Sequence, residues 1–199
     1  MVYFISVLIL RVMAFMFWKI DWLNTSSIPK TGAVFFVSKH SSWKDIIIIG
    51  LVSKRPVHFV AKVELWQINR FISWWLNAVG AIPIDREHPD PSTFKRVRKL
   101  LKDGEVVAIF PEGTRNDERK ITHFFEGVGV MSAKIDMVKL VPIVPDHKES
   151  IKRFGFVPAF HSVVTVGCAT IADNLKSKDI NDAIERNLKE LAAIAFNLA

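Results

Sequence analysis

The feature that most constrains the fold is a recurrence of short apolar runs, separated by longer segments whose apolar residues have helical spacing. The runs of strand type lie at 33–38, 57–61, 80–84, 105–110 and 140–144. The helical segments lie at 41–52, 63–79, 91–102 and 126–137, and a strand at 160–170 and a closing helix at 174–198 follow. Strands that alternate with helices predict an α/β fold: a layered single domain with a largely parallel central sheet flanked by helices. A chain of 199 residues has the length of one such domain.

The N-terminal segment is apolar enough to interact with lipid. From Met1 to Trp18 the only strongly polar side chains are those of Ser6 and Arg11, and a helix of this length measures roughly 26 Å. Arg11 lies near its middle, where a charge costs roughly 2.5 to 3.5 kcal/mol in a spanning helix. We therefore expect the helix to lie in the interface, with Arg11 and Lys19 reaching phosphate headgroups. A single span and a buried core helix are the alternatives.

This reading divides the chain in two. Residues 1–24 are predicted to form a membrane-associating apolar helix, and residues 25–199 the globular domain. The segment lacks the cationic start and the small-residue cleavage site of a secretory signal, so we expect it to be kept in the mature protein.

Charge and cysteine content narrow the classes of partner. The formal net charge of +7 indicates attraction to anionic surfaces, which nucleic acid, anionic lipid and phosphorylated substrates all provide. The basic run at 95–99 has no aromatic platform beside it. We interpret it as a solvated helix face or a lipid contact, and expect no nucleic acid partner. The single cysteine, Cys168, excludes a disulfide framework, and no histidine pair has metal-ligand spacing, so we predict no metal site.

The first candidate for chemistry is the hexapeptide HSSWKD at 40–45, which lies at the turn from the first core strand into its helix. If Ser42 caps that helix, Asp45 falls at the third helical position and its carboxylate reaches back towards the turn. His40 would then be a general base whose imidazole Asp45 orients and stabilises. The alternative is a capping box beside an ordinary turn histidine. No serine nucleophile elbow occurs in the chain, so we favour a base that acts directly on a substrate alcohol.

Two other blocks flank predicted strands. The block GAIPIDR at 80–86 brings Asp85 and Arg86 to a strand exit, where the planar guanidinium suits phosphate oxygens. An exposed ion pair in a surface turn is the alternative. The block VPIVP at 141–145 is a strand bracketed by prolines, which predicts an edge or irregular strand that walls an apolar pocket.

The block FPEGTR at 110–115 follows a strongly apolar run and resembles a phosphate cradle. Gly113 allows the main chain to approach a ligand, Thr114 offers a hydroxyl and Arg115 a fixed positive charge. Glu112 has the wrong sign for an anion site, so we expect it to orient an arginine or hold a hydroxyl. A tight turn with a solvated arginine is the alternative.

In this order and spacing, the blocks resemble the glycerolipid acyltransferase family, specifically the bacterial 1-acyl-glycerol-3-phosphate acyltransferases. The resemblance spans roughly residues 33–145 and includes Lys62 and Glu64. Two positions depart from it: Pro83 stands where an aromatic residue is frequent, and Asn116 where serine is frequent. Neither change removes a charged group.

The resemblance implies an O-acyltransferase of phospholipid biosynthesis. His40 and Asp45 would be catalytic, and His40 would deprotonate the sn-2 hydroxyl of lysophosphatidic acid for attack on an acyl thioester, giving phosphatidic acid. Acyl-CoA or acyl carrier protein would be a co-substrate, with no cofactor. The phosphate of the acceptor would be held by residues of the second and third blocks and their neighbours, namely Lys62, Arg86, Glu112, Gly113, Thr114 and Arg115.

The setting implied is the cytoplasmic face of the cell membrane, with the enzyme peripheral or monotopic and membrane lipids as partners. The aromatic-rich segment 65–76 would line an acyl groove or extend the membrane face, with core packing as the alternative. Two other functions stay open: acylation of another lysophospholipid or of glycerol-3-phosphate, and a non-catalytic module that binds phospholipid. The donor, the acyl chain length and the oligomeric state cannot be read from the sequence.

Overall fold

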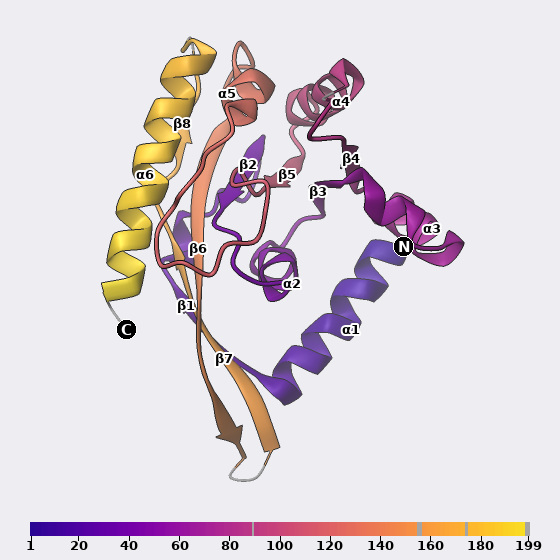
Figure 1. Cartoon of the computed structure of the whole chain (residues 1–199), viewed down its shortest axis with the longest axis vertical. Helices are drawn as coiled ribbons and strands as arrows, with labels where there is room; N and C mark the ends of the chain where they lie inside the picture. Colours follow the sequence, from indigo (N-terminus) through magenta and orange to yellow (C-terminus); the bar gives the residue numbers. More distant parts are fainter. Residues whose placement is uncertain (89, 155–156, 174, 198–199) are drawn as a thin grey trace.

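The computed structural model of the protein, which describes residues 1–88, 90–154, 157–173 and 175–197, is built on one twisted sheet with helices on both faces (Figure 1). The strands are β1 (Trp18–Leu23), β2 (Val34–Ser38), β3 (Val57–Lys62), β4 (Ile82–Ile84), β5 (Val106–Ile109), β6 (Lys139–Arg153), β7 (Val157–Val166) and β8 (Thr170–Ile171). The α-helices are α1 (Val2–Phe17), α2 (Lys44–Val52), α3 (Arg70–Ala78), α4 (Pro91–Lys102), α5 (Gly127–Ser132) and α6 (Ser177–Asn197). Two 3₁₀ turns, η1 (Thr25–Ser27) and η2 (Val63–Gln67), complete these elements.

The strand order is β1-β7-β6-β2-β5-β3-β4, with β8 paired to β6. The pairs from β6 through β2, β5 and β3 to β4 are parallel, as is β1 with β7, whereas β6 pairs antiparallel with β7 and β8. The predicted α/β domain with a mostly parallel central sheet is therefore confirmed. Parallel pairing brings the carboxyl ends of β2, β5, β3 and β4 to one edge of the sheet, where ligands commonly bind in such folds.

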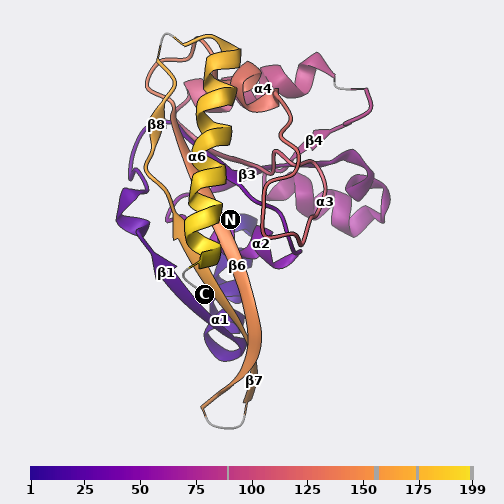
Figure 2. The same cartoon turned by 60° about the vertical axis from the view of Figure 1, so that its left-hand side comes forward.

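Alternation along the strands divides the core into two layers. Phe35 of β2 faces α4, α5 and α6, whereas its neighbour Phe36 faces α2 and the start of β1. Both phenylalanines are fully buried. Figure 2 shows α6 lying along one face of the sheet.

The predicted helix at 63–79 is divided in two by Asn69. The side chain of Asn69 accepts a hydrogen bond from the main-chain N–H of Ile72 at 2.8 Å and so starts α3 anew after η2. Near the middle of the chain, α5 occupies only part of the predicted helix at 126–137. Strand β1, which the sequence analysis did not foresee, lies at the edge of the sheet and continues directly from α1.

Of the two alternatives predicted for the proline-bracketed strand, an edge position is wrong, because β6 lies between β2 and β7. The carbonyl of Pro142 accepts from Gly167, so Pro142 faces β7 just where that strand has ended. Ile143 faces β2 through its carbonyl, which accepts from Lys39. By alternation Pro145 also faces β2, beyond the last paired residue, Ser38. The nitrogen of each proline, which has no hydrogen to donate, thus faces a position just beyond the end of the neighbouring strand.

Helix α1 packs loosely against the domain, and none of its residues is buried. The hydroxyl of Tyr3 accepts from the Val57 N–H at 3.0 Å, and the Trp75 indole donates to Ser6 at 3.1 Å. Because none of its residues is buried, α1 is not the buried core helix that was one of the predicted alternatives. Among the described residues, no helix is both long and apolar enough to cross a membrane.

Candidate active site

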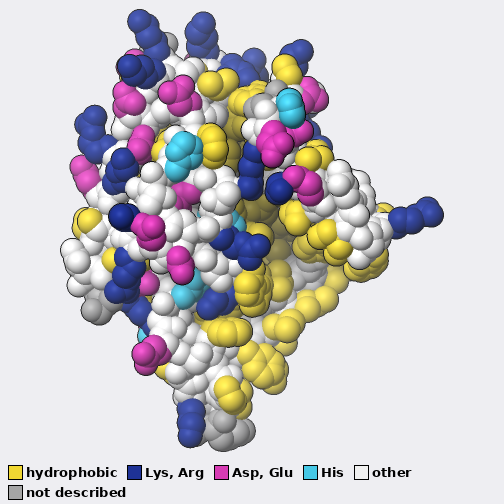
Figure 3. Space-filling model, in the orientation of Figure 1, with side chains coloured by type: hydrophobic (Ala, Val, Ile, Leu, Met, Phe, Trp, Pro, Cys, Tyr) yellow, Lys and Arg dark blue, Asp and Glu magenta, His cyan; other side chains and the backbone are white. Residues whose placement is uncertain are grey.

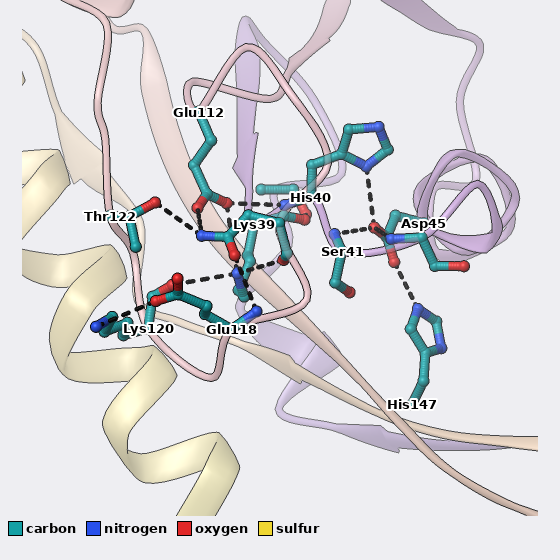
Figure 4. A network of polar contacts seen from close by, with 12 residues as sticks. Lys39, His40, Ser41, Asp45, Glu112, Glu118, Lys120, Thr122 and His147 are labelled. Atoms are coloured by element: carbon teal, nitrogen blue, oxygen red, sulfur yellow. Dashed lines mark hydrogen bonds and ion pairs between the residues drawn. The ribbon is translucent and has the colours of Figure 1, made fainter.

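His40 and Asp45 meet at the turn between β2 and α2. Asp45 lies in the first turn of α2, and its Oδ2 accepts hydrogen bonds of 2.7 Å from the main-chain N–H groups of both Ser41 and Ser42. The Nδ1 atom of His40 lies 3.0 Å from the same oxygen (Figure 4). The carboxylate therefore reaches back over the turn as predicted, and it holds the imidazole as well. The predicted cap is wrong, however, because Trp43 is the N-cap of α2 and Asp45 is the second helical residue.

The surroundings keep Asp45 ionised. Its side chain is fully buried. Burial alone would raise the pKa of Asp45, but hydrogen bonds from His147, His40 and the Ser42 main chain outweigh it and lower the pKa below the ordinary value of 3.8. A carboxylate only accepts, so the hydrogen on His40 lies on Nδ1 and the lone pair of its ring on Nε2. This is the tautomer that a general base needs.

The backbone of His40 is clamped by the loop that follows β5. The His40 N–H donates to Glu112 Oε2 at 3.2 Å, and the His40 carbonyl accepts from the Asn116 N–H at 2.8 Å. The imidazole stacks on the Phe110 ring, with centroids 4.1 Å apart and planes inclined by 23°. The FPEGTR block thus holds the histidine in place, although 72 positions separate His40 and Glu112 in the chain.

Glu112 has a different role from the one predicted. Its carboxylate pairs with Lys39 at 3.6 Å, and each side chain is 1% exposed. Lys39 also donates to the carbonyls of Asn116 and Lys120, at 3.0 and 3.2 Å, while the Asn116 amide donates to Glu112 at 3.2 Å. Glu112 therefore orients a lysine and the main chain of His40, not an arginine, and it is enclosed by protein. Lys39 is a residue that the sequence analysis did not single out.

Gly113 is required by its neighbours. Its φ of +73° lies in the left-handed region, and an added Cβ would lie 2.5 Å from Cε2 of Phe125. The space beside it is thus filled by an aromatic ring, whereas the sequence analysis expected an approach to ligand. Thr114 and Arg115, next in the loop, are both exposed.

The basic residues that are predicted to bind phosphate lie at or just after the ends of neighbouring strands. Lys62 ends β3, and its register partner Ile84 ends β4, so Arg86 lies two residues beyond that pair. Arg115 follows β5, which pairs with β3 on one side and with β2, the strand before His40, on the other. Lys62 forms a 2.7 Å ion pair with Glu64, and both side chains are about half exposed. The topology therefore brings the loops that carry His40, Lys62, Arg86 and Arg115 to the same edge of the sheet.

Comparison with known proteins supports the resemblance seen in these blocks. The sequence matches the profile of the Acyltransferase family over residues 19–146. The chain belongs to this family. A 1-acyl-sn-glycerol-3-phosphate acyltransferase of Bacillus subtilis is 42% identical over 96 residues, which is 48% of this chain and 48% of that protein. One of Streptococcus pneumoniae is 32% identical over 123 residues, covering 60% of this chain and 44% of that protein.

The match spans about half the length of these curated relatives. Among solved structures, the 1-acyl-sn-glycerophosphate acyltransferase PlsC of Thermotoga maritima has the same fold, with a TM-score of 0.67 and 22% identity. That alignment covers 92% of this chain and 76% of the solved one.

This member of the acyltransferase family carries a residue at its site that the sequence analysis passed over. His147 Nε2 lies 2.7 Å from Asp45 Oδ1, so imidazoles approach both oxygens of one carboxylate (Figure 4). The sequence pattern gives His147 no role, because the predicted strand ends at residue 144 and the histidines lack metal-ligand spacing. The observed strand β6 continues to Arg153 and carries His147 to the site. Among the described residues, no cluster of His, Cys, Asp or Glu could hold a metal ion.

Proposed function

We propose that this protein transfers a fatty acyl group from a thioester donor to the sn-2 hydroxyl of lysophosphatidic acid, giving phosphatidic acid. The observation that carries the proposal is the buried Asp45 carboxylate, which binds Nδ1 of His40 and so makes Nε2 the basic atom. The names of the bacterial relatives indicate the same reaction. The His40 loop also shares a sheet edge with three loops that carry cations, as an anionic acceptor requires.

The proposed step is direct attack without an acyl-enzyme. His40 Nε2 takes the hydroxyl proton while the hydroxyl oxygen bonds to the thioester carbonyl carbon. The tetrahedral intermediate then expels the thiolate, which takes the proton from the imidazolium, so the products are an ester and a thiol and His40 returns to neutrality. Asp45 stabilises the imidazolium through the Nδ1 hydrogen bond. General-base assistance of this kind is worth about 10² to 10⁴ in rate.

Arg86 and Arg115, with Lys62 as a weaker candidate, are proposed to bind the acceptor phosphate. Charge-assisted hydrogen bonds to phosphate contribute about 1.5 to 3 kcal/mol each. Thr114, exposed beside Arg115, adds a hydroxyl. Glu112 and Gly113 contact Lys39 and Phe125, respectively, which fill the space beside them. Their proposed contribution to phosphate binding is therefore to fix the conformation of the loop that carries Thr114 and Arg115.

The proposal includes work at a membrane surface. Apart from Arg11, the outward side chains of α1 are apolar: Phe4, Leu8 and Phe15 are 62%, 62% and 66% exposed. Figure 3 shows hydrophobic side chains gathered on the side of the molecule where α1 and α3 lie. In α3, Phe71 and Trp74 are 70% and 55% exposed, which excludes core packing for them and extends the same side. A surface of this kind lets the enzyme take a lysolipid without drawing the acyl tail into water.

A cationic cleft adjoins α1. It has a volume of about 930 Å³ and lies between α1, β1 and the end of α2. Its basic residues are Arg11, Lys30, Lys54 and Arg55. Lipid phosphates would neutralise them while α1 rests in the headgroup layer. Because acyl-CoA and acyl carrier protein are cytoplasmic donors, we place this surface on the cytoplasmic face of the cell membrane, as a peripheral or monotopic attachment.

The test of the reaction is acyl transfer by the purified protein in lipid vesicles. Lysophosphatidic acid is supplied with acyl-CoA or acyl carrier protein, and the product is identified by mass spectrometry. His40→Ala is expected to lower the rate at least 100-fold, while lysolipid binding persists. The matched control is His161→Ala, because His161 also pairs with an aspartate, Asp21, at 2.8 Å but lies on β7 with its partner on β1.

Three outcomes would contradict the proposal. An unchanged rate of acyl transfer in a folded His40→Ala variant would show that His40 is not the general base. Binding of lysolipid without transfer by the unaltered protein, with either donor, would favour a non-catalytic module. Preference for glycerol-3-phosphate or another lysophospholipid in a competition assay would reassign the acceptor.

A further inference from the structure

Asp45 binds a second imidazole that the proposed reaction does not use. His147 projects from β6 and reaches Oδ1 of Asp45, whereas His40 reaches Oδ2 from the opposite side (Figure 4). The His147 side chain is 15% exposed and Asp45 is fully buried. His147 lies two residues beyond the VPIVP block and is separated from Asp45 by 102 positions.

A chain of hydrogen bonds continues from His147 into the sheet. Its Nδ1 lies 2.8 Å from the hydroxyl oxygen of Ser162, the residue opposite it on β7. That hydroxyl also accepts from the indole N–H of Trp18 at 3.0 Å. Ser162 is fully buried and Trp18 is 6% exposed, so this end of the chain is shielded from water.

The two ends of this chain determine where the hydrogens lie. Asp45 only accepts, so Nε2 of His147 carries a hydrogen. At the other end the indole of Trp18 only donates, so Ser162 accepts from it and directs its own hydrogen to Nδ1 of His147. The neutral Nε2–H form of His147 satisfies every group in the series.

A proton added to His147 would break this pattern. Nδ1 would become a second donor to the Ser162 oxygen, and the hydroxyl hydrogen would lose its acceptor in a buried place. Buried polar groups without partners are strongly disfavoured. The hydrogen bonds around Ser162 are therefore complete only with His147 in its neutral Nε2–H form.

The other charged groups near His147 are engaged elsewhere. Its neighbours on β6, Asp146 and Lys148, point to the opposite face by alternation and pair with each other, and Asp146 also pairs with Arg119. On β7, His161 pairs with Asp21 of β1. From α2, Lys44 lies over the Phe160 ring, 4.8 Å from its centroid. Asp45 and His40 are thus the titratable groups that the described structure sets towards the His147 ring.

We propose that His147 is a positioning residue for acyl transfer, which fixes Asp45 with a neutral donor so that the aspartate charge serves His40 alone. This rests on the proposed function. A neutral partner holds the carboxylate in place without competing for its charge when His40 becomes an imidazolium. A cationic partner would share that charge and weaken the stabilisation of the transition state.

The first test compares His147→Ala with His147→Gln. Alanine removes the donor to Asp45, and kcat should fall about tenfold while KM for lysophosphatidic acid changes little, because the position of Asp45 affects the imidazolium that forms during transfer and not the binding of the lysolipid. Glutamine is always neutral and places an N–H near the Nε2 position, so it should restore most of the rate. His161→Ala is the control and should leave both constants unchanged.

The second test separates positioning from a merely structural role. Ser162→Ala leaves His147 on Asp45 but removes the hydroxyl whose hydrogen bonds are complete only with neutral His147. The transfer rate of this variant, relative to the unaltered protein, should therefore fall towards acid pH and stay close to one at neutral pH. The double variant Ser162→Ala/His147→Gln should regain the acid-side activity, because glutamine cannot be charged. Loss of activity at every pH in the double variant would show a structural effect and overturn the inference.

A spectroscopic measurement keeps the inference testable apart from catalysis. Nitrogen-15 NMR of the imidazoles in the detergent-solubilised full chain should show His147 as the neutral Nε2–H tautomer at neutral pH, with an unprotonated Nδ1. A His147 signal that is cationic at neutral pH, or wild-type kcat and pH profile in His147→Ala, would overturn the proposal. Absence of acyl transfer by the unaltered protein would instead reject the proposed function and leave the NMR result standing.

Discussion

At the scale of single residues, Asp45 is the side chain on which the hydrogen bonds of the site converge. Its two oxygens interact with His40, His147 and the main-chain N–H groups of Ser41 and Ser42. The lowered pKa of Asp45 means that the folded state prefers the ionised form more than the unfolded state does. The stability this adds is therefore complete above pH 3.8, the ordinary value, and is lost as the pH falls towards the pKa of the folded state.

We predict that Asp45→Asn lowers the free energy of unfolding by about 1.5 to 3 kcal/mol at neutral pH, the usual worth of hydrogen bonds to a buried charge. The difference from the unaltered protein should shrink below pH 3.8, because the Asp45 carboxyl of the unfolded chain is then protonated first and the folded one follows at lower pH. Urea unfolding at several pH values measures it. A difference that stays constant down to acid pH would contradict the assigned ionisation.

Gly113 provides the second prediction at this scale. Gly113→Ala should destabilise the protein and reduce transfer, because the new Cβ would collide with Phe125 and displace the loop that clamps His40. Gly32→Ala is the matched control: Gly32 has a φ of +78° but no atom within 4 Å of the added Cβ. Both variants carry the left-handed penalty of about 1 to 2 kcal/mol, and Gly113→Ala should cost about 1 to 3 kcal/mol more through overpacking. Equal melting temperatures would contradict the collision.

At the scale of elements, the loop after β5 is attached to the loop after β2 by a buried ion pair. Lys39 and Glu112 are each 1% exposed, and the same lysine holds two carbonyls farther along the β5 loop. Buried pairs of this kind add little net stability over apolar residues but are costly to break. The pair therefore fixes where the β5 loop lies relative to His40.

We predict that Lys39→Met lowers the free energy of unfolding by about 3 to 5 kcal/mol, because it leaves the Glu112 charge buried without its partner. The double variant Lys39→Met/Glu112→Gln should recover part of the loss. Lys189→Met is the control, since Lys189 forms an exposed pair with Glu185 on α6, worth at most about 1 kcal/mol. Denaturant unfolding gives all three values, and similar losses in Lys39→Met and Lys189→Met would refute a buried pair.

At the scale of the whole molecule, basic and apolar surfaces occur together on one side. The cationic cleft adjoins the exposed helix α1, whereas the basic helix α4 packs on the opposite face of the sheet. A net charge of +7 would attract the protein to anionic lipid in any orientation. The cleft would instead select the orientation in which α1 meets the membrane.

We predict that Arg11→Gln/Lys30→Gln/Lys54→Gln weakens binding to vesicles of phosphatidylcholine and phosphatidylglycerol by about 1 kcal/mol, or about fivefold, per charge removed. The control removes three exposed charges from α4, as Lys95→Gln/Arg96→Gln/Lys102→Gln. Its net charge therefore equals that of the cleft variant. It should weaken binding less. Vesicle co-sedimentation measures both, and equal losses would show attraction by net charge without a preferred face.

The sequence by itself determined the features that depend on local chemistry. Alternation of strand and helix patterns fixed the parallel sheet, and spacing along one helical turn fixed the reach of Asp45 back over 40–45. These follow from backbone geometry within a few residues.

Tertiary structure alone decided the partners of those groups. Lys39 with Glu112, Asp45 with His147, and Trp18 with Ser162 are pairs separated by 73, 102 and 144 positions. The edge position of β1 and the interior position of β6 were likewise decided by tertiary structure, since pairing depends on which strands meet in space. A side chain's type states what it can donate or accept, but only the packed sheet determines what stands opposite it.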